Sequence, residues 1–190
     1  RQQSNLIRDI FRQYTDLVEP VALDECYLDV THNRQPIPTA TETAQAIKQQ
    51  IKEQLQLTAS AGVATNKFLA KIASDMQKPD GLTVIKPQQA EDFLRGLPVN
   101  KIWGVGPVTH QQLKERKITS VGQLRQLSLV EMQRLWGKRG LRLYQLAQGV
   151  DEEPVDPSED RKSVSRETTF AQDLSSAERM KKELRISLMM

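Results

Sequence analysis

The feature that most constrains the fold is a change of pattern at Pro98. Before this residue, short β-branched apolar segments alternate with amphipathic helical ones; after it, short helical segments follow one another, separated by glycines. Alternating strands and helices predict helices packed on a sheet, whereas consecutive short helices predict an all-helical module. We therefore predict an α+β fold with a mixed domain over residues 1–96 and a small all-helical domain over residues 97–149.

Periodicity and turn residues place the elements of the mixed domain. Glu19-Pro20 predicts the end of the first helix, because proline cannot continue a helix. Thr39 followed by Glu42 predicts the capped start of the second helix. We expect helices over residues 4–17, 39–55, 66–76 and 87–97, and strands over residues 21–23, 26–30, 59–64 and 82–85.

Composition divides the rest of the chain. The all-helical domain is expected to contain helices over residues 107–117, 121–127, 129–135 and 141–148. Residues 150–162 are mostly acidic, contain Pro154 and Pro157 and lack periodicity, which predicts a linker. Residues 163–190 combine strand-like alternation with a helical segment, and so predict the start of a further α/β domain that stops before its core closes.

The charge is unevenly distributed along the chain. The net charge is +3, yet residues 1–100 carry −1, residues 101–149 carry +7 and residues 150–160 carry −6. A basic block of this kind attracts polyanions. The all-helical domain is therefore the part of the chain that we expect to bind nucleic acid.

Several classes of protein are excluded by composition. Cys26 is the only cysteine, so a disulfide framework and a cysteine-based zinc site are impossible, and the two histidines, His32 and His110, lie far apart in the sequence. No run approaches the roughly 20 apolar residues that span a bilayer, and the start of the chain lacks the apolar core of a signal peptide. We expect a cytoplasmic protein that does not bind membranes.

A glycine motif opens the basic block. Gly104-Val105-Gly106 joins two predicted helices and is followed by Pro107, a residue favoured at the first position of a helix. Such a bend points backbone N–H groups at the positive end of a helix dipole, where a phosphate binds. A plain turn between helices is the alternative. Residues 104–124 as a whole are similar to a helix-hairpin-helix, which grips the DNA backbone without reading its sequence, and Lys101 lies beside it.

Two further groups of residues could carry chemistry. Asp24 and Glu25 lie side by side at the expected turn, where both carboxylates can converge on a hard divalent cation such as Mg²⁺. Lys71, on the helix over residues 66–76, and Lys78, at the turn beyond it, could neutralise a triphosphate. Taken singly, each group is better explained as solvated charge on a turn or a helix, and the functional interpretation depends on their combination.

Together these motifs identify a family. The segments that carry the likeness resemble the Y-family DNA polymerases, and among them the bacterial DNA polymerase IV type: residues 21–30 (VALDECYLDV), 59–75 (ASAGVATNKFLAKIASD), 78–81 (KPDG) and 102–106 (IWGVG). This resemblance implies a palm over residues 1–96, a thumb with the helix-hairpin-helix over 97–149, an acidic linker over 150–162 and the start of a little-finger domain over 163–190. It implies low-fidelity, translesion DNA synthesis on damaged or distorted templates, without a proofreading exonuclease.

The resemblance also implies roles for individual residues. Asp24 and Glu25 would be the catalytic, magnesium-binding pair, and Lys78 would bind the incoming deoxynucleoside triphosphate with support from Lys71. The DNA-binding positions would be Lys101, Gly104, Val105, Gly106 and, in the little finger, Arg166. The implied partners are primer-template DNA, deoxynucleoside triphosphates and, in the full-length protein, a sliding clamp, with the polymerase itself a monomer.

The sequence departs from the family pattern in two ways. Ala22 stands where the family usually has serine, and Cys26 where it usually has alanine; both are small residues. In relatives, the first metal-binding aspartate, the aromatic steric gate and the fingers domain lie upstream of the segment that corresponds to Arg1. We therefore expect the 190-residue chain alone to bind DNA weakly and not to polymerise.

Two other functions compete with this interpretation. One is a non-catalytic module that binds the DNA backbone through its basic helical block. The other is a palm with a different substrate, as in nucleotidyl cyclases, which has no use for a hairpin that grips phosphates. Steep loss of affinity with salt is expected of both DNA-binding interpretations.

Overall fold

The computed structural model describes residues 2–158, 169–170 and 173–188. Its contacts divide the chain into two units, residues 1–158 and residues 159–190. Regular structure in the described part of the second unit consists of helix α9 (Ala177–Leu188). The expected strand over residues 162–170 lies almost wholly outside the described residues.

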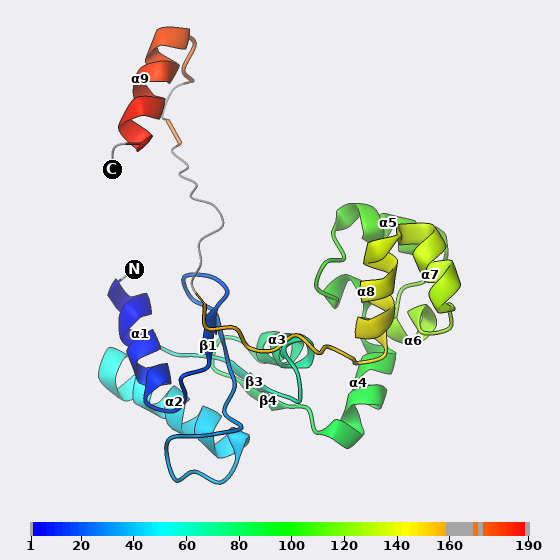
Figure 1. Ribbon diagram of the computed structural model, residues 1–190, viewed down its shortest axis with the longest axis horizontal. Helices are drawn as coiled ribbons and strands as arrows, with labels where there is room; N and C mark the ends of the chain where they lie inside the picture. Colours follow the sequence, from blue (N-terminus) through cyan, green and yellow to red (C-terminus); the bar gives the residue numbers. More distant parts are fainter. Residues whose placement is uncertain (1, 159–168, 171–172, 189–190) are drawn as a thin grey trace. The chain divides into compact units, whose positions relative to one another are not determined.

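The amino-terminal part of the first unit mixes helices and short strands (Figure 1). The elements are α1 (Gln2–Arg12), β1 (Val18–Pro20), β2 (Cys26–Leu28), α2 (Ala40–Leu55), β3 (Ala61–Val63), α3 (Lys67–Met76), β4 (Leu82–Val84), the 3₁₀ turn η1 (Pro87–Gln89) and α4 (Ala90–Gly96). β1 and β2 pair antiparallel, with Val18 opposite Leu28. β3 and β4 pair in parallel, with Ala61 opposite Leu82, and α3 is the crossover between them.

The local signals in the sequence place helices α2 and α3 correctly. Thr39 caps α2 by accepting a hydrogen bond from the Glu42 amide, as the sequence predicts. Asn66 caps α3 in the same way by accepting from the Leu69 amide. Each side chain satisfies an amide that has no partner within its helix, which explains why the helices begin where they do.

The first predicted strand is displaced. α1 ends at Arg12, and Glu19-Pro20 lies in β1 instead of ending the helix. The reason is a contact that sequence spacing does not reveal: Thr15 Oγ1 donates to the carbonyl of Asp29 at 2.6 Å, which turns the chain alongside the end of β2. Residues 21–23, expected as a strand, lie with the predicted turn Asp24-Glu25 in the connection between β1 and β2.

The second part of the unit is helical, as predicted. Its elements are the 3₁₀ turn η2 (Val99–Lys101), α5 (Pro107–Glu115), α6 (Val121–Leu124), α7 (Leu129–Trp136) and α8 (Lys138–Ala147). Capping boxes at Ser120 and Ser128 start α6 and α7. Gly140 lets α8 pack closely on α7, because a Cβ there would lie 1.9 Å from the carbonyl oxygen of Met132.

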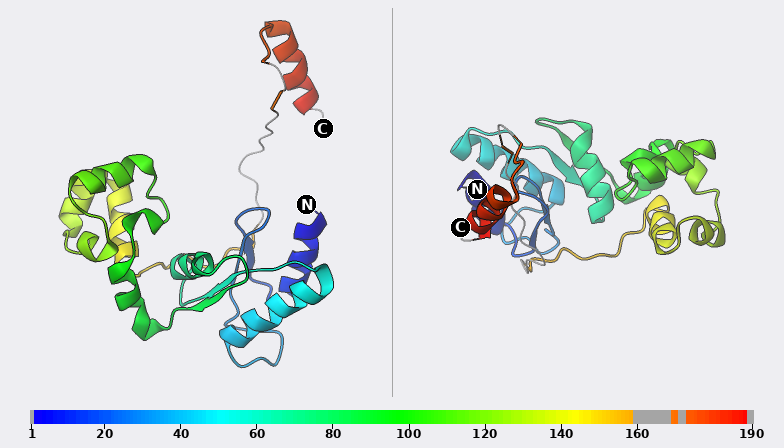
Figure 2. Two further views of the ribbon diagram at one scale, coloured as in Figure 1. Left: turned by 180° about the vertical axis from the view of Figure 1, so that it is seen from behind. Right: turned by 90° about the horizontal axis from the view of Figure 1, so that it is seen from above.

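Two clusters of buried side chains hold the first unit together. The smaller joins α1 to α2 and includes Ile10 and Ile51. The larger begins in α3 with Leu69, continues through Leu94 of α4 and ends in α8 with Leu146. Because this core is continuous, α3 and the helices of the second part share one hydrophobic core. Figure 2 shows α3 beside β3 and β4, with α4 leading into the helical part.

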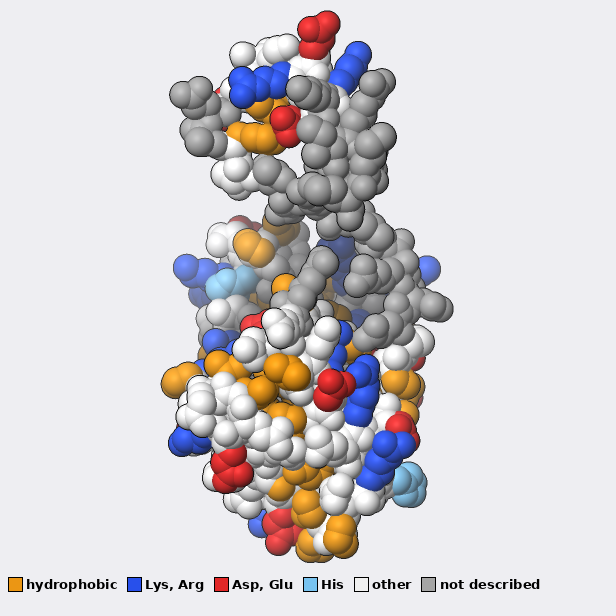
Figure 3. All heavy atoms as spheres, turned by 90° about the vertical axis from the view of Figure 1, so that its left-hand side faces the viewer, with side chains coloured by type: hydrophobic (Ala, Val, Ile, Leu, Met, Phe, Trp, Pro, Cys, Tyr) orange, Lys and Arg blue, Asp and Glu red, His pale blue; other side chains and the backbone are white. Residues whose placement is uncertain are grey.

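The surface charges agree with the sequence pattern. On the α1–α2 side of the first unit, acidic and basic side chains are interspersed and neither sign dominates (Figure 3). Within the described residues, no helix is long and apolar enough to cross a bilayer.

Candidate active site

The acidic pair lies on the turn between β1 and β2. The amide of Val21 donates to the carbonyl of Glu25 at 2.9 Å, which closes this turn. Asp24 is exposed at its tip, and the Glu25 side chain is one-third exposed. Both carboxylates are thus accessible on one short loop, as the sequence predicts.

Helix α3 brings the lysines to this turn. Phe68, Leu69, Ile72 and Ala73 are the buried residues of α3 and face the core. The opposite face carries Lys71, whose Nζ lies 2.6 Å from Glu25 Oε1, and Lys78 Nζ lies 3.7 Å from the same oxygen. The structure therefore brings together three of the four residues expected at the chemical centre, across 46 and 53 positions of sequence.

A further acid, Asp75, links the two lysines. Its carboxylate lies 2.7 Å from Lys78 Nζ and 3.6 Å from Lys71 Nζ. Burial by itself would raise the pKa of Asp75, but hydrogen bonds from Lys78 and Lys71 and their positive charges lower it overall. Asp75 was not among the residues predicted for the site; its spacing of four from Lys71 and three from Lys78 is the signal that could have indicated it.

The fourth residue expected at the centre, Asp24, interacts with Lys78 through its charge. The pKa of Lys78 is raised, chiefly by its hydrogen bond with Asp75; burial opposes this rise, and the negative charges of Asp75, Glu25 and Asp24 add to it. Lys78 therefore stays protonated at neutral pH. A fixed positive charge beside an exposed carboxylate suits a site that receives an anion together with a divalent cation.

A second ion pair borders this centre. Lys67 Nζ lies 2.9 Å from Glu19 Oε2 and 5.5 Å from the centre of the Tyr27 ring. Burial, then the charge of Glu19 and of neighbouring acids, raises the pKa of Tyr27 to about 12. Lys67 is thus held by its ion pair with Glu19 and by its contact with the face of the Tyr27 ring.

The donor set fits a magnesium ion that is completed by substrate. Among the described residues, no three His, Cys, Asp or Glu side chains converge as a metal cage. Mg²⁺ does not need such a cage, because it keeps several waters and binds proteins through one or two carboxylates plus substrate phosphates. Asp24 and Glu25 could supply these carboxylates, and Lys71 and Lys78, which contact Glu25, could supply positive charge for the phosphates.

The glycine hairpin precedes α5. Gly104 has φ +90°, which explains the glycine, and Gly106 is the N-cap of α5 without a side-chain hydrogen bond. Space beside both glycines is open to another molecule. The predicted helix before the hairpin is α4, which ends at Gly96, and the 3₁₀ turn η2 lies between α4 and the hairpin. Trp103, which the sequence analysis passed over, is 72% exposed on this hairpin.

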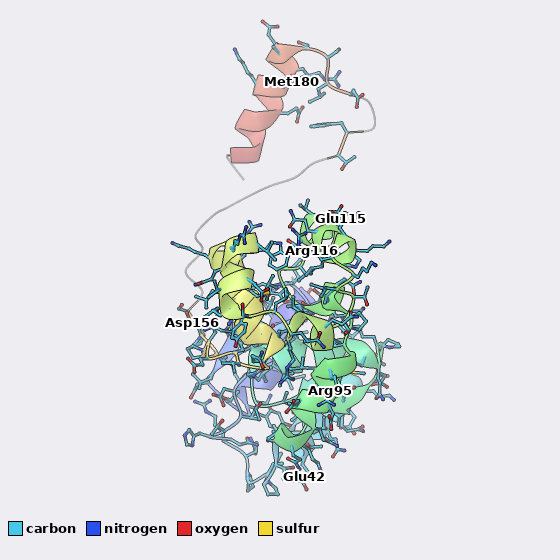
Figure 4. The ribbon with its side chains drawn as sticks, turned by 90° about the vertical axis from the view of Figure 1, so that its right-hand side faces the viewer. Glu42, Arg95, Glu115, Arg116, Asp156 and Met180 are labelled. Carbon is cyan, nitrogen blue, oxygen red and sulfur yellow. The ribbon has the colours of Figure 1, made fainter. Side chains whose placement is uncertain are left out.

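The basic residues of the helical part do not all lie at the hairpin. Lys101 is exposed directly before it. Arg116 and Lys117 follow the last residue of α5, a nine-residue helix about 13 Å long, so they lie at the end opposite Gly106. Figure 4 shows Arg116 beside Glu115 there. Arg166 lies outside the described residues.

Comparison with known protein families agrees with these two sites. Residues 1–75 match the impB/mucB/samB family, and residues 100–151 match the thumb domain of DNA polymerase iota. The two matches cover the acidic turn with most of α3, and the glycine hairpin with the helices after it. The chain belongs to the Y family of DNA polymerases.

Its relatives within that family carry the name DNA polymerase IV. The protein of Clostridioides difficile is 54% identical over 171 residues, which are 90% of this chain and 47% of the relative. That of Alkalilimnicola ehrlichii is 52% identical over 180 residues, which are 95% of this chain and 51% of the relative. The crystal structure of DinB from Sulfolobus solfataricus superposes with a TM-score of 0.73 at 37% identity, over 82% of this chain and 46% of that one. The chain spans about half the length of the curated relatives it matches.

Proposed function

We propose that this chain supplies part of the catalytic site and the DNA-binding thumb of a translesion DNA polymerase. The polymerase would add deoxynucleotides to a primer by phosphoryl transfer, with low fidelity, on damaged or distorted templates. The observation that carries the proposal is the cluster in which Glu25 contacts Lys71 and Lys78 beside the exposed Asp24. Membership of the Y family supports it.

Each residue of the cluster has a separate role in this proposal. Asp24 and Glu25 hold Mg²⁺, which supplies Lewis-acid stabilisation of the attacking and leaving oxygens when it is bound. Lys78 binds the triphosphate, and its raised pKa keeps it charged. Lys71 holds the Glu25 carboxylate in place at 2.6 Å and neutralises it until the cation arrives. A further carboxylate of the metal site comes from the part of the polymerase that this chain does not span.

The glycine hairpin binds the DNA strand. Gly104, Val105 and Gly106 present backbone amides to phosphates at the start of α5, and Lys101 adds a positive charge. Arg166 contacts the template backbone from the little finger. We assign the palm to residues 1–96, the thumb to 97–149, the linker to 150–162 and the start of the little finger to 163–190, in a monomeric, cytoplasmic polymerase that also engages a sliding clamp.

A chimeric polymerase tests this function. The matching 171 residues of the Clostridioides difficile enzyme are replaced by this chain, and primer extension and DNA affinity are measured separately. Asp24→Asn should lower the extension rate by about a hundredfold or more, since a metal contact is worth several kcal/mol in the transition state. DNA affinity, measured by fluorescence anisotropy, should change by less than about twofold, because the hairpin is untouched.

The controls separate the two candidate functions. Asp92→Asn removes an acid whose side chain is 83% exposed on α4 and should leave extension unchanged. The 190-residue chain alone should bind DNA without extending a primer. A non-catalytic DNA-binding module remains the second candidate, because the described residues offer only the Asp24–Glu25 pair as cation ligands at this turn. It would be favoured if Asp24→Asn reduced binding and extension equally.

A further inference from the structure

The segment after α8 is attached to the start of α3. The side-chain amide nitrogen of Asn66 donates to the carbonyl of Gly149 at 2.8 Å. The oxygen of the same side chain accepts from the Leu69 amide at 3.0 Å and caps α3. One asparagine therefore both starts the helix and holds the chain that leaves the thumb.

Asp151 makes a second and stronger attachment two residues later. Its side chain is 3% exposed, and its two oxygens have different partners. Oδ2 accepts from the Phe68 amide of α3 at 3.0 Å, and Oδ1 accepts from the Arg142 guanidinium of α8 at 2.7 Å. Burying a carboxylate is energetically costly unless its oxygens have hydrogen-bond partners. Asp151 keeps both partners only when α3 and α8 hold this position relative to each other.

The attachment continues along the same segment. The amide of Asp156 donates to Glu19 Oε2 at 2.9 Å, and Glu19 is in turn paired with Lys67 of α3. Figure 4 labels Asp156 on this segment. Residues 150–156 were predicted as part of an acidic linker; Asp151 differs from the acids around it because its charge is buried and shared between two helices.

Helix α3 connects this attachment to the chemical centre. Its first turn receives Asp151, and one turn further on Lys71 contacts Glu25 at 2.6 Å. α8 belongs to the same core as α5 and the glycine hairpin. The two ends of the site, the acidic turn and the hairpin, are therefore fixed to one ten-residue helix, on the palm side by Lys71 and on the thumb side by Asp151.

We propose that Asp151 is a positioning residue that locks the thumb against α3 and so sets the placement of the DNA-binding hairpin relative to the Asp24–Glu25 turn. It belongs to neither the proposed cation site nor the DNA-binding hairpin, and it acts through Arg142 and the first turn of α3. The catalytic part of this inference rests on the proposed function, but the locking itself does not.

A distance measurement on the 190-residue chain tests the lock directly. Cysteines that carry dyes replace Gln54 of α2 and Val130 of α7, both exposed, and Cys26→Ala removes the native thiol. Single-molecule energy transfer then reports the distribution of distances between the two dyes. Asp151→Ala and Arg142→Gln should broaden a narrow distribution while the helical circular dichroism is retained. Glu152→Gln, which removes the neighbouring exposed charge, should leave it narrow. A narrow distribution in Asp151→Ala, or loss of helical signal in both variants, would overturn the proposal.

Primer extension by the chimera tests the consequence. Asp151→Ala should lower kcat by about 10- to 100-fold, the effect expected of displacing a reacting group by about 1 Å, with DNA affinity within about twofold of the unmutated chimera. Glu152→Gln should match the unmutated chimera. Failure of the unmutated chimera to extend primers would count against the proposed function, whereas equal kcat values for Asp151→Ala and the unmutated chimera would count against Asp151 alone.

Discussion

Adding a single methyl group at Gly62 of β3 should displace α3 and so disrupt the candidate active site. A Cβ at Gly62 would lie 2.0 Å from the carbonyl oxygen of Ala70, 2.4 Å from the amide nitrogen of Ser74 and 2.9 Å from the Ala73 Cβ, all on α3. Ordinary contacts between such atoms begin near 3.5 Å. Gly62→Ala therefore requires α3 to move away from β3 by more than about 1 Å.

The cost follows from what the methyl group meets. Overpacking a core costs about 1–3 kcal/mol when side chains can adjust, and backbone atoms cannot rotate aside, so we expect about 3 kcal/mol or more. For a unit of this size, a loss of about 1 kcal/mol in the free energy of unfolding lowers Tm by about 2–4 °C. A loss of about 3 kcal/mol therefore predicts a fall in Tm of about 6–12 °C. Because α3 carries Lys71, the same displacement should separate Lys71 from Glu25 and reduce primer extension by the chimera.

Thermal unfolding of the 190-residue chain, followed by circular dichroism, measures this effect. Gly96→Ala is the matched control, since Gly96 ends α4 and nothing lies within 4 Å of a Cβ built there. The control should stay within about 0.5 kcal/mol of the unmutated protein. A Gly62→Ala protein that melts together with the control would show that α3 is not held against β3 as described.

Two further predictions concern charge. Lys101→Ala should reduce the slope of log affinity against log salt concentration for DNA by about 0.9, if Lys101 contacts one phosphate, whereas Lys52→Ala on α2 should leave the slope unchanged. Asp75 has a lowered pKa, so its contribution to stability is present above its ordinary value of 3.8 and disappears as the pH falls through the lowered value. The difference in Tm between the unmutated chain and Asp75→Asn should therefore shrink from about pH 6 to about pH 3, and a constant difference would contradict the ion pairs with Lys71 and Lys78.

Most helices could be predicted from sequence because their signals are local. Thr39 and Asn66 bond to amides three residues away, and the apolar residues of α2 and α3 recur with the helical period. The turn that carries Asp24 and Glu25 and the glycines before α5 were predictable for the same reason. The roles of these residues came from the order and spacing of whole motifs in a known family, since each residue alone is equally compatible with a solvated charge or a plain turn.

Failures of prediction occurred where distant residues decide the outcome. Pro20 reads as a helix stop, but Thr15 bonds to Asp29 and draws the chain into β1. Asp151 reads as one more acid of a linker, but Phe68, 83 positions earlier, and Arg142 on α8 take it out of solvent. In both cases a side chain is fixed by a hydrogen bond to a partner whose position depends on packing.

The sequence by itself therefore determined the mixed and helical parts, the capped starts of helices such as α2, and the basic block, because these depend on neighbours within about one helical turn. Only the tertiary structure decided which of those residues meet. The contacts of Glu25 with Lys71 and Lys78, and of Asp151 with α3 and α8, join residues whose proximity arises from core packing and from hydrogen bonds across the fold. Those contacts turn separate motifs into one site.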